Sequence, residues 1–505
     1  MPEHRAAALS ELPNGKPHMV ELDGTKVVLV RQGETVHALA GLCPHKGVPL
    51  DKGIVADGTI VCGVHRAAFA LSTGEVVKPP ACENLARYAV RLADGDVHVT
   101  IPEDQEPHPI PEMARKGNTN RHFVVVGAGA AGWRAAETLR REGFDGRLTV
   151  VSDEHAQPYD RTDLSKSYLG PDEPGDLTIR TRERAEAADI ELVHASVQGL
   201  DPKAKTLTLK NGSQRTMAFD RLLLATGSAA AVPDLPGADL AGVHTIRTLS
   251  DAKALRGDLS DAARVVIVGG GFIGFEAAAS LSKRESLSVT VVVREDVPFA
   301  SQFGEAFGKR LVREHGDAGV TVLTGTETKA LEGEGRVARV VTDGGTLDAD
   351  VAILATGAKP RTGWLPFETG EDGGIAVDDQ CRVEESSDIF AAGDIARVPT
   401  AWGKVRIEHW RFAQEMGECA ARAMLDGDGT YRGTPFFWTM QQIAGSYTYT
   451  GHAGDWDAAD GSVEEQDFKL SLVEDGRVAA VLAHGIDDEV TALEPAMAGK
   501  GPLPR

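Results

Sequence analysis

A repeated glycine motif is the feature that most constrains the fold of this chain. The segment HFVVVGAGAAGWRAAETLRREG, residues 122–143, reads as a strand, a glycine turn and a helix, and RVVIVGGGFIGFEAAASLSKR, residues 264–284, repeats that order. The glycines allow a tight turn and a close approach of the backbone to a pyrophosphate at the start of the helix. The repeat therefore predicts two dinucleotide-binding domains, over residues 121–250 and 251–372.

The motif also predicts where the dinucleotides bind. Its glycines are Gly127, Gly129 and Gly132 in the first copy, and Gly269, Gly271 and Gly274 in the second. In the first copy Asp153 ends the next strand, where an acidic residue hydrogen-bonds a ribose. In the second copy that place holds Val293, followed by Arg294, which suits a 2′-phosphate, and Glu295, which suits a 2′-hydroxyl. The second site therefore leaves NADH and NADPH open.

Two matched pairs of metal-binding residues stand near the N-terminus. LCPHKGVPL holds Cys43 and His45, and after sixteen residues CGVHRAAF holds Cys62 and His65. Each loop supplies one thiolate and one imidazole between β-rich runs, whereas zinc fingers place their histidines together on one helix. The pattern favours a Rieske [2Fe–2S] cluster, in which two thiolates bind one iron and two imidazoles the other. A Cys2His2 zinc site and buried residues without metal are the alternatives.

Residue pattern and composition divide the rest of the chain into segments. Residues 1–103 hold short β-rich runs between Asp-Gly turns and predict an all-β domain, here the Rieske domain. Residues 104–120 are rich in Pro and charge and predict a linker. Residues 373–432 return to a strand, an AGD turn and a helix, which predicts the second part of the first dinucleotide-binding domain. Residues 433–505 predict a small α+β domain.

Composition disfavours several classes of partner. The net charge of −22 is spread along the chain, which disfavours nucleic acid and anionic membranes. No stretch reaches about 18 consecutive apolar residues, and the first residues are not continuously apolar, so neither a membrane span nor a signal peptide is predicted. Only five cysteines occur in 505 residues. This usage is typical of a reducing compartment, and we expect a cytoplasmic protein.

Several segments resemble a known family. Resemblance to the FAD-dependent pyridine nucleotide reductases, which have a glutathione-reductase-like fold, rests on QPYDRTDLSKSYL (157–169), LLLATGS (222–228), VAILATGAKPRT (351–362) and IFAAGDIAR (389–397). IEHWRFAQEMG and PFFWTMQ resemble the apoptosis-inducing-factor branch of these reductases. With its paired Cys and His residues, the chain is similar to the Rieske-bearing apoptosis-inducing-factor-like flavoproteins, which are akin to the ferredoxin reductases of oxygenase systems.

The resemblance implies an FAD site and a site for NADH or NADPH as substrate. The flavin contacts that it implies are Gly127, Gly129, Gly132, Asp153, Arg161, Lys166, Thr226, Gly227, Asp394 and Trp410. The nicotinamide nucleotide contacts are Gly269, Gly271, Ile273, Gly274, Glu295 and Gly357. It further implies that Lys166, Glu276 and Trp410 are catalytic, with the Lys166 cation steadying the reduced flavin. Simple packing of Trp410 and solvent exposure of Lys166 and Glu276 are the alternatives.

Three positions around the cluster depart from the family pattern. Pro44 and Gly63 stand where high-potential Rieske proteins carry a disulfide, which implies the lower end of the Rieske potential range. Arg66 follows the ligand His65, where ferredoxin-type members have Gly. A cation there raises the cluster's reduction potential or faces an acidic partner. A solvated surface side chain is the alternative.

The predicted function is electron transfer from NAD(P)H, through FAD and the Rieske cluster, to a one-electron acceptor such as a ferredoxin or an oxygenase component. The segment 157–169 has no cysteine pair, so disulfide reduction is not expected. An apoptosis-inducing-factor-like flavoprotein that switches binding or signalling with its redox state, and an NADH oxidase, are the alternatives. The sequence leaves open whether the β-domain docks on its own flavin or on a neighbour's, and a homodimer is one expectation.

Overall fold

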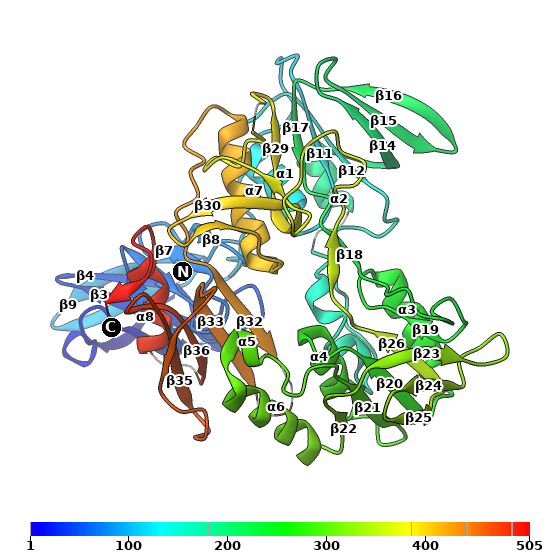
Figure 1. Ribbon diagram of the computed structural model, residues 1–505. Helices are drawn as coiled ribbons and strands as arrows, with labels where there is room; N and C mark the ends of the chain where they lie inside the picture. Colours follow the sequence, from blue (N-terminus) through cyan, green and yellow to red (C-terminus); the bar gives the residue numbers. More distant parts are fainter. Residues whose placement is uncertain are drawn as a thin grey trace.

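The computed structural model places the N-terminal β-domain beside the C-terminal domain, and two α/β units extend from this pair (Figure 1). It describes residues 2–179, 182–384, 386–440, 443, 445–485 and 488–504, without the side chains of residues 182–184 and 440. Gln441, the last residue of the PFFWTMQ segment, lies outside this range. The fold class expected from the sequence, an all-β domain followed by an α/β reductase unit with a small α+β domain, is confirmed.

The N-terminal domain consists of two antiparallel sheets. The larger has the order β1 (Glu3–Ala8), β10 (Asp96–Thr100), β9 (Arg87–Ala93), β4 (Thr35–Ala40), β3 (Thr25–Gln32) and β2 (Pro17–Leu22). The smaller has the order β5 (Ile54–Ala56), β6 (Thr59–Val61), β7 (Ala68–Ala70) and β8 (Val76–Lys78). The Asp-Gly turns that join several strands have positive φ at both residues, as at Asp23 (46°) and Gly24 (79°). Asp and Gly tolerate this conformation, which matches the twist of a hairpin.

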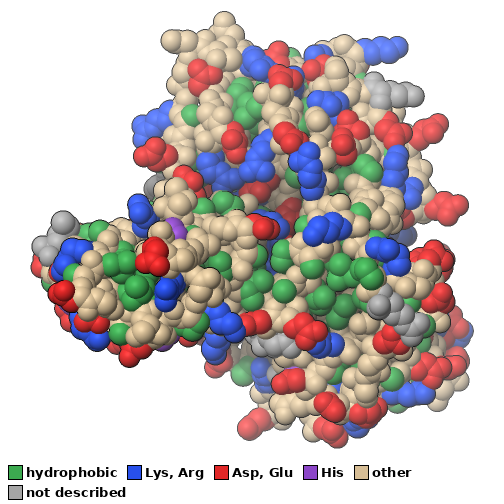
Figure 2. Space-filling view, turned by 90° about the vertical axis from the view of Figure 1, so that its left-hand side faces the viewer, with side chains coloured by type: hydrophobic (Ala, Val, Ile, Leu, Met, Phe, Trp, Pro, Cys, Tyr) green, Lys and Arg blue, Asp and Glu red, His purple; other side chains and the backbone are tan. Residues whose placement is uncertain are grey.

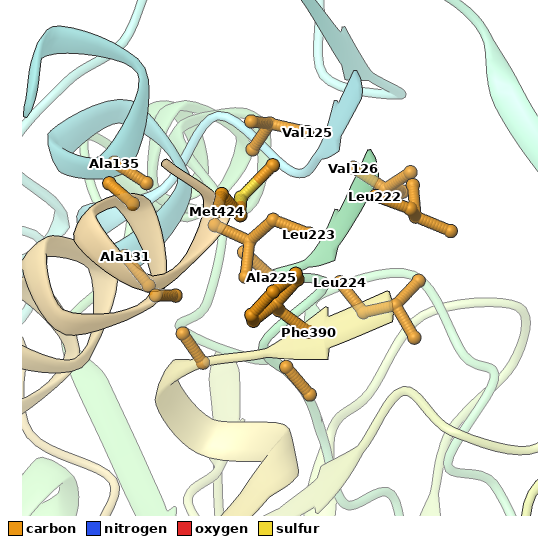
Figure 3. Close-up of a cluster of buried hydrophobic side chains, with 14 of the residues drawn as sticks. Val125, Val126, Ala131, Ala135, Leu222, Leu223, Leu224, Ala225, Phe390 and Met424 are labelled. Carbon is orange, nitrogen blue, oxygen red and sulfur yellow. The ribbon is translucent and has the colours of Figure 1, made fainter. Parts of the chain in front are cut away.

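The first α/β unit has a parallel sheet at its centre. Its order is β13 (Ile190–His194), β12 (Arg147–Ser152), β11 (His122–Val126), β17 (Arg221–Leu224) and β29 (Ile389–Ala391). Helices α1 (Ala130–Arg141) and α7 (Trp410–Met424) pack on each other beside the sheet. The buried strands read as continuous apolar runs because both faces are covered. Figure 3 shows Val125, Leu223 and Phe390 from three strands close to Ala131 of α1 and Met424 of α7.

The second α/β unit repeats the first. Its parallel sheet has the order β19 (Val243–His244), β26 (Val351–Leu354), β20 (Arg264–Val268), β21 (Ser288–Val292) and β22 (Thr321–Leu323). Its helices are α3 (Leu249–Asp258), α4 (Phe272–Leu281), α5 (Ala300–Phe303) and α6 (Glu305–Asp317). Each unit also carries a three-stranded antiparallel sheet, β14–β16 (196–218) in the first and β23–β25 (328–348) in the second. The internal duplication expected from the glycine motif is thus present.

Two groups of short elements connect these units. Strands β18 (Ser228–Ala230) and β27 (Ala358–Pro360) pair antiparallel and carry the chain between the two α/β units. The return of the chain to the first unit includes β28 (Ile375–Ala376), β30 (Ala396–Thr400), β31 (Gly403–Val405) and the 3-10 helix η5 (Gly393–Ile395). The first α/β unit is therefore assembled from two separate stretches of sequence.

The C-terminal domain is a mixed unit that touches the N-terminal one. Its sheet has the order β32 (Phe436–Met440), β33 (Ser446–Gly451), β36 (Arg477–His484), β35 (Phe468–Glu474) and β34 (Ala458–Asp460), with β37 (Leu503–Pro504) paired to β36. Helix α8 (Asp488–Met497) lies against β5 of the N-terminal domain. Both chain ends lie on this side of the molecule (Figure 1).

The predicted linker forms neither helix nor strand. Its first half is bonded to the N-terminal domain, since the N–H groups of Asn84 and Ala86 donate to the carbonyls of Pro109 and Pro107, both at 2.9 Å. Its second half is bonded to the first α/β unit, since the N–H of Ala114 donates to the carbonyl of Arg140 at 2.8 Å. The linker thus follows the seam between the two parts.

The outer surface carries charges of both signs. On the face seen in Figure 2, Lys and Arg side chains are interspersed with Asp and Glu side chains. Within the described part of the chain, no helix combines the length and the apolar character that a membrane crossing requires.

A buried ion pair joins three parts of the fold. Arg134 of α1 and Glu418 of α7 are 3% and 5% exposed, and Arg134 Nε lies 2.7 Å from Glu418 Oε1. Arg134 Nη1 also donates to the carbonyl of Ala81 in the N-terminal domain, at 3.1 Å. A charge buried to this degree stabilises the fold only while its partner stays in place.

We expect Arg134→Met to lower the free energy of unfolding by about 3 kcal/mol, because the buried carboxylate of Glu418 then loses its fully buried partner and keeps the partly buried Arg141. Urea denaturation followed by tryptophan fluorescence measures the change. The matched control is Arg147→Met, whose exposed pair with Glu191 contributes less than about 1 kcal/mol. Equal destabilisation by the two substitutions would contradict the assignment.

Candidate functional site

The two Cys–His loops fold in the same way. In the first loop the N–H of Gly47 donates to the carbonyl of Cys43 at 2.9 Å, and in the second the N–H of Arg66 donates to the carbonyl of Cys62 at 3.1 Å. The sulfur of each cysteine also accepts from backbone N–H groups of the residues that follow it. The loops therefore present two sulfurs from equivalent positions, each inside a nest of N–H donors that favours a thiolate.

The four predicted ligands are gathered as a sulfur pair and a nitrogen pair. Cys43 and Cys62 are buried, and the hydrogen bond between their thiols lowers the pKa of Cys62 to about 7 and raises the pKa of Cys43. The Nδ1 atoms of His45 and His65 lie 3.1 Å apart. Burial lowers the pKa of His45 to about 4 and the pKa of His65 well below its usual value, so both rings are neutral, the form that binds a metal.

This donor set fits a two-iron cluster. Two facing thiols and two facing imidazole nitrogens match the mixed ligation of a Rieske [2Fe–2S] centre. A zinc ion held by the same residues would need all four donors around one point. Among the described residues, no three His, Cys, Asp or Glu side chains are gathered in that way. The arrangement therefore favours the cluster over a single zinc ion.

Most of the predicted flavin contacts line one cavity of about 570 Å³. The predicted residues in its wall are Gly127, Gly129, Asp153, Arg161, Lys166, Thr226, Gly227, Ile273, Glu276, Asp394 and Trp410. They come from the ends of β11, β12 and β17, from η5 and from the start of α7 in the first α/β unit, from α4 in the second, and from the segment 157–169. The carboxyl ends of parallel strands form a crevice at such a place, which is where dinucleotides bind.

The glycines of the motif have separate tasks. A Cβ on Gly129 would meet only the Nη2 atom of Arg161 at 3.8 Å, so the backbone there stays open to the cavity. Gly132 is not in the cavity wall. A Cβ on it would lie 1.9 Å from the carbonyl oxygen of Gly127, and a Cβ on Gly274 would lie 2.2 Å from that of Gly269. The third glycine of each motif therefore lets the helix approach the strand.

An ion pair crosses the cavity wall between the two α/β units. Lys166 and Glu276 are 6% and 4% exposed, and Lys166 Nζ lies 3.3 Å from Glu276 Oε2. Ser165 Oγ donates to Glu276 Oε2 at 2.7 Å, and Thr439 Oγ1 donates to Glu276 Oε1 at 2.8 Å. These contacts fix a cation and a carboxylate at the cavity. The alternative of solvent exposure for Lys166 and Glu276 is wrong.

The cavity wall also contains Glu154, Arg247, Arg361 and a tryptophan of β32, none of which was identified from the sequence. Asp153, 53% exposed in its side chain, pairs with Arg361 at 3.1 Å, and Asp394 of η5 pairs with Arg247 at 2.6 Å. Glu154 pairs with Arg161 at 3.0 Å. The pairs with Arg361 and Arg247 join distant segments, and such pairs leave no pattern in a single sequence.

That tryptophan, Trp438, connects the cluster ligands with the cavity. Its ring lies edge-on to the ring of His65 at 4.3 Å, and Lys166 Nζ lies over it at 5.7 Å from its centroid. Its backbone N–H donates to Nε2 of His409 at 3.3 Å, and burial lowers the pKa of His409 to about 3. The PFFWTMQ segment contains Trp438, but nothing in its spacing predicts this contact.

The imidazole ligands share the wall of the flavin cavity. His45 and His65 line it together with Lys166 and Trp438. On the surface beside His45, Lys46 Nζ reaches Asp163 at 2.8 Å and Asp160 at 3.5 Å in the segment 157–169. The N-terminal domain thus docks with its metal-binding end on the predicted flavin site of the same chain.

Trp410 lies between two cavities. It begins α7 and lines the flavin cavity, and it also lines a second cavity of about 220 Å³ at the seam between the domains. His45 and Pro80 belong to both walls as well. Trp410 therefore lines the same two cavities as a predicted cluster ligand, and both its predicted role at the flavin and simple packing remain open.

The predicted nicotinamide nucleotide contacts lie apart from this cavity, except Ile273. Gly269, Glu295 and Gly357 follow β20, β21 and β26 at the carboxyl edge of the second parallel sheet, and Gly271 and Gly274 open α4. Arg294 and Glu295 form an exposed ion pair at 3.1 Å. Arg294, which suits the 2′-phosphate of NADPH, and Glu295, which suits the 2′-hydroxyl of NADH, thus lie next to each other.

Arg66 is not a surface residue. It is 1% exposed and lies at the contact between the N-terminal and C-terminal domains, so the expected alternative of a solvated side chain is wrong.

Comparison with known proteins agrees with both halves of this site. The family model described as pyridine nucleotide-disulphide oxidoreductase matches residues 121–417, and the model described as Rieske [2Fe-2S] domain matches residues 3–89. Apoptosis-inducing factor 3 of Homo sapiens is 33% identical, over 97% of this chain and 83% of that protein.

Reductases of oxygenase systems are similar over the larger part of the chain. The ferredoxin--NAD(+) reductase subunit of the benzene 1,2-dioxygenase system of Pseudomonas putida is 33% identical, over 72% of this chain and 88% of that protein. The crystal structure of the covalent putidaredoxin reductase–putidaredoxin complex superposes with a TM-score of 0.69 at 26% identity, and covers 76% of this chain and 96% of that one.

We expect Gly132→Ala to weaken FAD binding by more than about tenfold, because the overlap with the carbonyl of Gly127 costs about 1–3 kcal/mol or displaces α1. Flavin content after purification, read from visible absorption, measures the effect. Gly316→Ala is the control, since a Cβ there meets no atom within 4 Å. Full flavin content in Gly132→Ala would contradict the role given to the third glycine.

Proposed function

Because the chain belongs to the pyridine nucleotide-disulphide oxidoreductase family and carries a Rieske [2Fe–2S] domain, we propose that it transfers electrons from NAD(P)H to a one-electron acceptor through the Rieske domain of the same chain. The acceptor that we propose is a ferredoxin or an oxygenase component, as in the systems of the related reductases. FAD is the cofactor of the reductase part, and NAD(P)H is the substrate.

The observation that carries this proposal is the shared cavity. His45 and His65, two of the proposed cluster ligands, line the cavity whose wall also holds Gly129, Arg161 and Lys166. When bound, FAD supplies the conversion of a hydride into single electrons, and the cluster supplies a one-electron store. Because the residues that would hold the two cofactors share one cavity wall, the arrangement favours transfer inside one chain over transfer between subunits.

The residues around the cavity have roles that suit this chemistry. The ammonium group of Lys166 provides a fixed positive charge where negative charge develops on a reduced flavin. Glu276, with Ser165 and Thr439, holds that ammonium group in place. The ring of Trp438 packs edge-on against the ring of His65 at the wall that the cavity shares with the cluster ligands.

The cysteines suit electron transfer rather than disulfide reduction. The segment 157–169 contains no cysteine, and all five cysteines of the chain are free thiols. Two of them are the proposed cluster ligands, and Cys381 and Cys419 pack near each other at α7. A cytoplasmic location is proposed on this use of thiols. A homodimer is the proposed assembly, which sedimentation would test.

We expect Cys43→Ser to leave NADH-driven reduction of ferricyanide within about twofold of the parent rate and to lower reduction of the protein acceptor by more than about 100-fold. The physical reason is that one thiolate of the cluster is lost while the flavin cavity is untouched. Steady-state rates with both acceptors are the measurement. Thr59→Ser, in β6 of the same domain, is the control.

Unchanged turnover of Cys43→Ser with the protein acceptor would exclude the route through the cluster. NADH-driven peroxide formation with no added acceptor, at the rate seen with the acceptor, would identify an oxidase instead.

We expect Lys166→Ala to slow flavin reduction by NADH about 10- to 100-fold, because a fixed cation at the flavin is removed. Stopped-flow absorbance gives this rate, and the spectrum of the cluster should not change. Since the single substitution leaves the Glu276 carboxylate buried without its cation, Lys166→Ala/Glu276→Gln separates that effect. Lys253→Ala, on the exposed face of α3, is the control. A loss of the cluster spectrum would mean that Lys166 is misplaced.

A further inference from the structure

Arg66 has a left-handed backbone conformation, which is unusual for an arginine. Its φ is +63°, and Gly47, which occupies the equivalent place in the first loop, has a φ of +68°. Both residues donate their N–H to the carbonyl of the loop's cysteine. A left-handed conformation suits glycine and costs a residue such as arginine about 1–3 kcal/mol. The second loop therefore keeps an arginine where glycine would relax the backbone, and the reason must lie in the side chain.

The side chain of Arg66 leaves its own domain. It is 1% exposed, and its Nη1 atom donates to the carbonyl of Gly63 and to Oγ1 of Thr491, each at 2.5 Å. Its guanidinium also lies over the ring of Phe436, 5.5 Å from the centroid. Thr491 is in α8 and Phe436 is in β32, both of the C-terminal domain. The residue after a cluster ligand thus binds an element 425 positions further along the chain.

Helix α8 presents one face to the Rieske domain. Asp488, Thr491 and Glu494 are three residues apart and so lie along one side of the helix. Their respective partners in the Rieske domain are Lys16 at 3.6 Å, Arg66 at 2.5 Å and Lys78 at 3.4 Å. The first pair is exposed and contributes little. Glu494 is held mainly by Arg411 of α7, at 2.5 and 2.8 Å, and the ammonium group of Lys78 is partly exposed. Thr491 and Arg66 are each 1% exposed, so theirs is the buried contact between α8 and the Rieske domain.

We propose that Arg66 is a positioning residue that latches the second cluster loop onto helix α8, so that the cluster is held at the flavin cavity of its own chain. The inference rests on the proposed function, because it concerns delivery of electrons to that cluster. His65, the ligand beside Arg66, contacts Trp438 two residues after Phe436. The latch and the contact between ligand and cavity wall therefore share one strand, β32.

The latch has an electrostatic consequence as well. Arg66 carries a permanent positive charge that is buried within one residue of a cluster ligand. Such a charge stabilises the reduced form of the cluster, which has one more electron. Removal of the charge therefore lowers the cluster's reduction potential. A lysine at the same position restores the positive charge and part of the lost potential.

Two substitutions on opposite sides of the contact test the latch in the complete holoenzyme. Arg66→Gly suits the left-handed backbone, so the Rieske domain keeps its fold and its cluster. Thr491→Val removes the acceptor hydroxyl from α8 with little change in volume and leaves the cluster loops untouched. We expect each to slow reduction of the cluster after flavin reduction about tenfold, the effect of about 1.4 kcal/mol of lost docking energy. The combined variant should be no slower than the slower single one.

Measurements other than turnover distinguish loss of docking from loss of the cluster. Amide hydrogen exchange of the α8 peptide should become faster in Arg66→Gly and Thr491→Val, and iron content should stay equal to the parent. An EPR-monitored titration gives the reduction potential of the cluster. This potential should be lower than the parent's in Arg66→Gly, between that value and the parent's in Arg66→Lys, and equal to the parent's in Thr491→Val. Arg91→Met is the matched control, since Arg91 is an exposed arginine that pairs with Glu3 inside the same domain.

The outcomes distinguish the two proposals. If NADH reduces the flavin of the parent protein but never its cluster, the proposed function is wrong. If the parent cluster is reduced rapidly and both variants keep that rate and the protection of α8, the latch is wrong although the function stands. A loss of iron in Arg66→Gly, with Thr491→Val unchanged in rate and exchange, would also overturn the latch.

Discussion

Docking of the Rieske domain on the reductase part is the constraint on which the rest of the structure depends. The cluster ligands His45 and His65 reach the flavin cavity only because the domain is held with its metal-binding end inward. Three elements from different parts of the chain hold it there. The segment 157–169 binds Lys46, α1 binds the carbonyl of Ala81, and α8 binds Arg66. A reductase that carries its own electron acceptor needs such a fixed arrangement, since a domain on a free linker would seldom be in the productive orientation.

Buried ion pairs lie directly behind this seam. Arg134 with Glu418 in the first α/β unit, and Arg411 of that unit with Glu494 of α8, are almost fully removed from water. Arg134 also binds the carbonyl of Ala81, and Glu494 also binds Lys78, both in the Rieske domain. Replacing such pairs by apolar side chains often costs no stability, whereas removing one partner costs a great deal. We interpret them as a device for orientation, because each is satisfied in one geometry only. An apolar seam of equal area would tolerate small rotations of the domain, and a rotation would move the cluster ligands relative to the flavin cavity.

The two α/β units show how one local geometry serves two sites. Gly127 and Gly269 have φ values of +110° and +118°, and a Cβ on either would collide with a carbonyl oxygen of the neighbouring strand segment, at Ala225 and Ala355. The units differ in what covers the turn. The first is covered by the segment 157–169 and the docked Rieske domain, which together form one side of the cavity wall. The second is exposed at Glu295 and Arg294, which suits a nucleotide that binds and leaves.

The sequence by itself determined the parts that depend on near neighbours. The two glycine turns, the Asp-Gly hairpins and the Cys–His loops follow from residues within a few positions of each other, because backbone conformation and loop hydrogen bonds are local. Tertiary structure alone decided which partners meet. The contacts of His65 with Trp438 and of Arg66 with Thr491 join residues hundreds of positions apart, and neither side carries a pattern that names the other. Such contacts join side chains of separate domains, so their physical cause is the complementarity of the two docked surfaces.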